Sequence, residues 1–250
     1  MEILGIAISD RAVKQIEELC GAFSRQVRYL PIESRSDGGG EGTAGDDRAA
    51  YYTVYLEHDP DRHMFEANIL HELYHIRQFE AGFPALCNKS SQLYISDSDI
   101  VEQIGGSIFS CVLDLEVYER LRECRYSDSV FADADQLYDS LLKAAEVERS
   151  DPDDKYDFAY LVTIFAKALY LTNPEQDEKL KEQFKNCPRI MERSLGMRDM
   201  LRSNHPGTPE SAVIAMGSML DMLELWDLFY IRLADKMIRT KNEFEAYTNK

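Results

Sequence analysis

Hydrophobic positions in the first third of the chain follow two periodicities, which predicts short strands mixed with helices. A helix is expected from Asp10, as its N-cap, to about Phe23. The Gly-rich stretch Ser34–Asp47 cannot pack a core and is expected to form a flexible loop. Alternating or continuous apolar runs between turn residues predict strands at Glu2–Ser9, Gln26–Leu30 and Ala50–Leu56.

Apolar residues recur at helical spacing between Met64 and Phe79, which predicts a helix after the turn-forming triplet Asp59-Pro60-Asp61. One strip of this helix is more polar than the rest and suits a site that lines a cleft. The strip runs through Asn68, His71, His75 and Gln78.

After Gly82-Phe83-Pro84 the pattern predicts almost only helices. They are expected at about Asp97–Cys124, Ala132–Glu148, Asp154–Leu171, Pro174–Asn186, Pro188–Arg202 and Pro209–Tyr247. The last has Thr208 as its N-cap and carries a Met-rich apolar stripe that we expect to be buried in a helical core. A protein partner could use this stripe as the alternative. The stripe contains Ala212, Met216, Met219, Leu220, Leu223, Trp226 and Phe229.

The fold class expected from these patterns is α+β and predominantly α. We find no internal repeat and no sharp change of composition, so residues 1–250 are expected to form a single domain. A possible subdivision separates residues 1–125, with the small sheet, from residues 126–250, which are helical.

The pentapeptide His71-Glu72-Leu73-Tyr74-His75 is an HExxH motif within the predicted helix. Residues four apart lie about 40° apart around a helix, so both imidazoles can bind one metal ion. Glu72 lies beside the histidine pair, where a general base can take a proton from a water molecule. The motif therefore predicts a metal centre, with a satisfied pair of core histidines as the alternative.

A third ligand is needed, because catalytic zinc usually has three protein ligands and one open position. Ala81 stands where a metzincin has its third histidine, so that subclass is excluded. Asp114 and Glu116 are the candidates, since both lie in the strongly apolar segment 111–121. We favour Asp114, because its surroundings on the helix are apolar and an unpaired carboxylate would be costly there. Glu116 is the alternative ligand, although an ion pair with Arg120 would explain its charge without a metal. That neither residue binds metal is the remaining alternative. Gly105-Gly106 would let the same helix approach another backbone closely, or would mark an irregularity in it.

The stretch from Ala50 through the HExxH helix to Leu121 resembles the zincin metallopeptidases, and within them the gluzincins, including ImmA/IrrE-like peptidases. The resemblance implies a zincin-like N-terminal part in which His71 and His75 bind Zn²⁺, Glu72 is the general base and Asp114 takes the position usually held by Glu. It also implies that Tyr51–Leu56 pairs with an extended peptide or protein substrate.

Zinc-dependent peptide hydrolysis is the function that these observations favour. Four residues are possible donors to the oxyanion, namely Tyr118, His58, His63 and His205. A catalytically inactive zincin-fold protein that binds a partner through the helical C-terminal part is the alternative. A di-iron protein is disfavoured, because the chain has no second ExxH motif.

Charge and cysteine content narrow the possible partners and compartment. The formal net charge is −17, which argues against binding to nucleic acid or to anionic membranes. The five cysteines are scattered without a CxxC pair, which favours a reducing compartment. Residues 1–9 do not have the pattern of a signal peptide and no long apolar run is present. We therefore expect a cytoplasmic protein.

Overall fold

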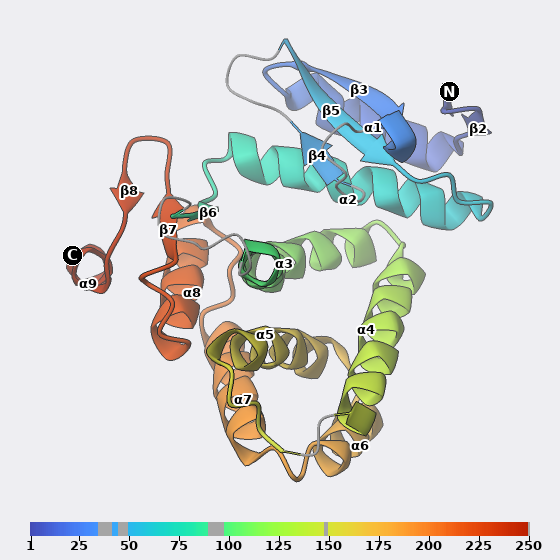
Figure 1. Cartoon of the computed structure of the whole chain (residues 1–250). Coiled ribbons are helices and arrows are strands. Elements are labelled where there is room, and N and C mark those ends of the chain that lie inside the picture. Colours follow the sequence, from blue (N-terminus) through green and yellow to red (C-terminus); the bar gives the residue numbers. More distant parts are fainter. Residues whose placement is uncertain (35–41, 45–49, 90–97, 148–149, 250) are drawn as a thin grey trace. The chain divides into compact units, whose positions relative to one another are not determined.

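The computed structural model describes residues 1–34, 42–44, 50–89, 98–147 and 150–249 (Figure 1). Helices dominate and the strands form small sheets, so the α+β, predominantly α class is confirmed. The chain divides into two compact units, Met1–Gly82 with Val117–Val130, and Phe83–Glu116 with Phe131–Lys250. This division differs from a single boundary at residue 125, because Phe83–Glu116 belong to the unit that contains the C-terminal helices.

The first unit begins with a small hairpin in place of the single strand expected over Glu2–Ser9. Strands β1 (Glu2–Ile3) and β2 (Ile6–Ala7) are antiparallel, and Leu4 and Gly5 between them have φ of 51° and 83°. Two successive positive φ values turn the chain back on itself, so a continuous strand was the wrong prediction. Helix α1 (Asp10–Ala22) follows, and its N-cap is Ser9, one residue before the expected Asp10.

A three-stranded sheet has the order β3-β5-β4. Strand β3 (Gln26–Pro31) is parallel to β5 (Tyr51–Leu56), and β4 (Gly42–Ala44) is antiparallel to β5. Strands β3 and β5 confirm the predictions. The segment expected to be a loop contains β4, and most of its other residues lie outside the described part of the chain.

Helix α2 (Arg62–Glu80) contains the pentapeptide motif and packs on α1, β5 and β4. The side chain of Asp61 accepts hydrogen bonds from the backbone N–H groups of His63 and Met64, so the turn triplet ends in the N-cap. One face of α2 is buried through Phe65, Ile69, Leu70, Leu73 and Ile76. Because this face is buried, the helix cannot rotate, and the side chains of Asn68, His71 and His75 remain half-buried on another part of its surface.

Seven further helices lie in the described residues, and five of them match predictions within a few residues at most ends. Helix α4 begins five residues before its predicted start. The helices are α3 (Ser98–Glu123), α4 (Ser127–Val147), α5 (Lys155–Leu171), α6 (Pro174–Gln183), α7 (Pro188–Ser203), α8 (Pro209–Met222) and α9 (Lys241–Thr248). In none of the helices among the described residues is there an apolar stretch long enough to cross a membrane.

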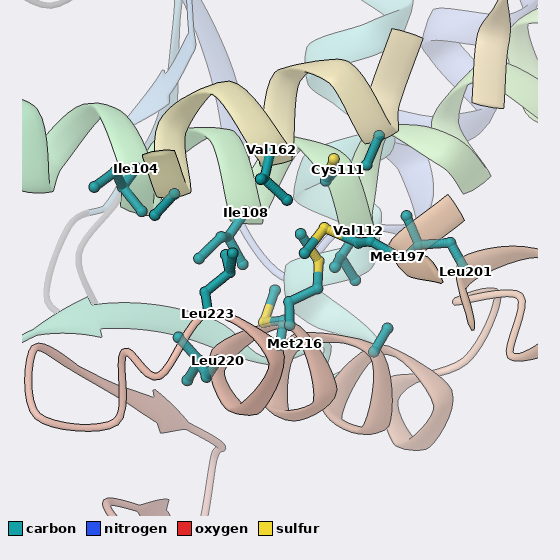
Figure 2. Packing of buried hydrophobic residues seen from close by; sticks show 14 of the residues in the cluster. Ile104, Ile108, Cys111, Val112, Val162, Met197, Leu201, Met216, Leu220 and Leu223 are labelled. Carbon is teal, nitrogen blue, oxygen red and sulfur yellow. The ribbon is translucent and has the colours of Figure 1, made fainter. Parts of the chain in front are cut away.

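The core of the second unit is formed where α3, α5, α7 and α8 meet (Figure 2). Ile108 and Val112 of α3, Val162 of α5, Met197 of α7 and Met216 of α8 are fully buried. Most of the Met-rich stripe lies inside this core, as expected: the side chains of Ala212, Met216, Met219, Leu220 and Leu223 are buried.

The helix predicted over Pro209–Tyr247 is wrong beyond residue 222. Glu224 has a φ of 56°, which ends the helix, and the chain continues into β7 (Phe229–Arg232) and β8 (Met237–Ile238). Strand β7 also pairs antiparallel with β6 (Ala85–Asn88), where only helices were expected. A Cβ atom on Gly105 would lie 2.9 Å from the Phe229 ring, so this glycine allows α3 to approach β7 closely.

Candidate metal centre

The two histidines of the motif point their Nε2 atoms at each other from successive turns of α2. These atoms are 3.0 Å apart, and both side chains are half-buried. Two ligands of a tetrahedral ion at about 2.0–2.1 Å would be separated by about 3.3 Å. The spacing of the pair is therefore close to the one that a single metal ion requires.

Gln78 contacts the second ring nitrogen of His75. Its Oε1 lies 3.0 Å from Nδ1 of His75, and the Gln78 side chain is buried one turn further along α2. An amide oxygen accepts only, so Nδ1–H is the donor and Nε2 keeps its lone pair. A metal-binding histidine commonly has such a second partner, which orients the ring.

Asp114 completes a group of possible metal donors. One ligand atom from each of His71, His75 and Asp114 lies within 4.8 Å of the others. Two imidazoles and one carboxylate form a donor set that suits zinc and related divalent ions. The group could therefore hold a metal ion.

Asp114 is not surrounded only by apolar groups, so the apolar surroundings predicted for it were wrong. Its Oδ2 accepts hydrogen bonds from Ser110 Oγ at 2.5 Å and from Lys167 Nζ at 2.7 Å. The Lys167 ammonium also donates to Ser110 Oγ at 2.5 Å. The carboxylate is buried, and a cation from α5 neutralises it.

The other acidic residues of the motif and of α3 occupy different positions. Glu72 is half-buried on α2, beside the histidine pair in the sequence. Glu116 is buried on α3, two residues beyond Asp114, which turns it about 160° away around the helix. Glu116 does not belong to the group of possible donors found among the described residues.

Of the possible oxyanion donors, Tyr118 lies next to the histidines. Its ring centroid is 5.9 Å from that of His71, and its side chain is buried. His63 instead stacks on Tyr126 at a centroid distance of 4.6 Å. His58 is exposed before α2, and His205 is a half-buried residue shortly before α8.

Tyr74 packs inside the first unit. Its hydroxyl lies 3.1 Å from Sγ of Cys124. Burial, followed by the contact with Cys124, raises the pKa of the Tyr74 hydroxyl, so the side chain stays neutral at physiological pH. Tyr74 therefore acts as a core residue that joins α2 to the end of α3.

The backbone of β5 is already engaged within the sheet. Residues Thr53–Tyr55 pair with β3 on one side and with β4 on the other. A substrate strand cannot pair with this part of β5, which corrects the role expected for Tyr51–Leu56. In the described sheet β4 is the edge strand on that side.

Ser110 and Lys167 were not identified from the sequence. Lys167 is a single charge in the apolar segment 161–171, and such a residue needs a partner when its helix is buried. That signal could have identified it. The search against protein-family models, curated proteins and solved structures found no match for this chain.

Proposed function

We propose that the protein is a zinc-dependent metallopeptidase. The observation that carries the proposal is the 3.0 Å spacing of the two Nε2 atoms, with a carboxylate ligand atom within 4.8 Å of both. The resemblance of the segment to zincins points to peptide bonds as the substrate. The five free thiols support a role in a reducing compartment.

The residues of the site have distinct roles in this proposal. His71, His75 and Asp114 would hold the zinc ion, which would supply a Lewis acid for the scissile carbonyl. Glu72 accepts a proton from the attacking water and returns it to the leaving amine. Tyr118, whose ring lies 5.9 Å from that of His71, would donate a hydrogen bond toward the developing negative charge.

Variants that affect zinc binding and peptide hydrolysis separately test the proposal. Glu72→Gln should retain one zinc per chain but lose hydrolysis of a peptide library by about 10²-fold or more, because general-base catalysis contributes that much. His71→Ala should lose the zinc. His63→Ala is the matched control, since His63 is on the same helix outside the donor group, and it should keep both zinc and activity.

The third ligand is tested in the same way. Asp114→Asn should lower zinc affinity strongly, whereas Glu116→Gln should leave it unchanged. Equal activity of Glu72→Gln and the wild type would remove the mechanism. Zinc binding without hydrolysis by the wild type would favour the inactive, partner-binding alternative, and absence of zinc binding would remove the proposed peptidase activity.

A further inference from the structure

Lys167, Ser110 and Asp114 form a closed triangle of polar groups within the second unit. Both donors use the same carboxylate oxygen, Oδ2 of Asp114, at 2.5 and 2.7 Å. An oxygen of a carboxylate has two lone pairs, so these bonds saturate Oδ2. Asp114 therefore has two polar partners that do not depend on a metal ion.

We infer that Lys167 is the resident counter-ion of the metal centre: it holds Asp114 in its ligand position without metal, and it weakens metal binding. This inference rests on the proposed zinc site. A positive charge 2.7 Å from the ligand carboxylate neutralises part of the charge that attracts a divalent cation. It also repels the ion itself through a partly buried medium, where screening by water is weak.

The same contact stabilises the protein without metal. The side chains of Lys167 and Asp114 are 16% and 10% exposed, so neither charge could be buried alone without a large penalty. Asp114 therefore does not depend on metal for a partner. We therefore expect the second unit to stay folded when the metal ion dissociates, so that metal can bind again.

A neutral donor in place of Lys167 separates these effects. Lys167→Gln can still donate hydrogen bonds but removes the charge that repels a cation, so the affinity for zinc, measured by competition with a chromophoric chelator, should rise at least about tenfold. The melting temperature without metal should fall. Lys167→Arg keeps the charge and should keep zinc affinity within about threefold. Lys155→Gln is the matched control on the same helix, because Lys155 is half-exposed and should change neither value.

A second variant uses the pocket beside the cluster. Lys167 and Ser110 line a pocket of about 330 Å³ together with Ser107 and Tyr160. In Lys167→Ala, propylammonium should enter this pocket, restore the melting temperature without metal and lower the zinc affinity toward the wild-type value. Ethylene glycol of similar size, which is neutral, should do neither.

The outcomes separate this inference from the proposed function. Unchanged or weaker zinc binding in Lys167→Gln, with zinc bound normally by the wild type, overturns the inference alone. Failure of propylammonium to alter the zinc affinity of Lys167→Ala also overturns it. Absence of zinc binding by both the wild type and Lys167→Gln overturns the proposed function and this inference together.

Discussion

Gly217 of α8 is the point at which α9 packs most closely, so Gly217→Ala should destabilise the second unit. A Cβ atom there would lie 2.2, 2.4 and 2.6 Å from three atoms of the Phe244 ring. Carbon atoms normally approach to about 3.5–4.0 Å, so the ring must move by more than about 1 Å. Overpacking of this kind costs about 1–3 kcal/mol.

The upper limit of the cost is the loss of the buried Phe244 ring, about 3 kcal/mol. Alanine regains about 1 kcal/mol, because glycine is unfavourable within a helix. We therefore expect a net loss of about 0–2 kcal/mol, which corresponds to a decrease in melting temperature of up to about 8 °C for a chain of this size. Gly106→Ala on α3 is the control. Its Cβ atom meets nothing within 4 Å, so it should stabilise the protein by about 0.5–1 kcal/mol.

Urea unfolding followed by tryptophan fluorescence is a suitable assay for Gly217→Ala. The chain has a single tryptophan, Trp226, whose ring centroid lies 5.6 Å from that of Phe244, so its emission reports on this contact. In a Phe244→Ala background the same change should stabilise by up to about 1 kcal/mol, because only the helix preference remains. A Gly217→Ala protein as stable as Gly106→Ala would refute the packing of α9 on α8.

The other predictions concern charge, orientation and burial. Burial alone would raise the pKa of Glu66, but hydrogen bonds from Ser9 and Tyr126 outweigh burial and lower the pKa below 4.5. The Glu66 carboxylate therefore stabilises the folded protein above pH 4.5. This contribution is lost as the pH falls through the lower pKa of the folded state. Tyr126→Phe should therefore unfold at a higher pH in an acid titration followed by circular dichroism, and an unchanged midpoint would contradict this. Gln78→Leu should weaken zinc binding about 10–100-fold in chelator competition, whereas unaltered affinity would show that Gln78 does not orient His75. Burial raises the pKa of the Cys111 thiol to about 12, so DTNB at pH 8 should label it only after unfolding; rapid labelling of the native protein at this position would disprove its burial.

Local signals explain which parts of the fold could be predicted. Helix α2 could be predicted because its apolar residues recur at helical spacing directly after a turn-forming triplet, which ends in the N-cap Asp61. The end of α8 was missed because Leu223, Trp226 and Phe229 continue the helical period across it. The turn there uses Glu224 at positive φ, without the glycine that usually marks such a position. Strand β6 has no signal of its own, since its partner is near the other end of the chain.

The site shows the same contrast. The histidine pair follows directly from helical geometry, so its alignment could be predicted from residue numbers alone. The contact of Asp114 with Ser110 lies one helical turn away, but its contact with Lys167 could not be predicted, because Lys167 comes from another helix. Choosing between Asp114 and Glu116 needed the direction of α3, which the sequence does not specify.

The pairing of β6 with β7 joins residues more than 140 positions apart. This sets the order in which the second unit can be completed during synthesis. Strand β6 leaves the ribosome long before β7 exists, and closing so long a loop is entropically costly until the helices between them have collapsed. Until then the edge of β6 and the surface at Gly105 remain uncovered. A nascent chain that stops before Phe229 should therefore be the form that proteases and chaperones recognise, even when its helices have formed.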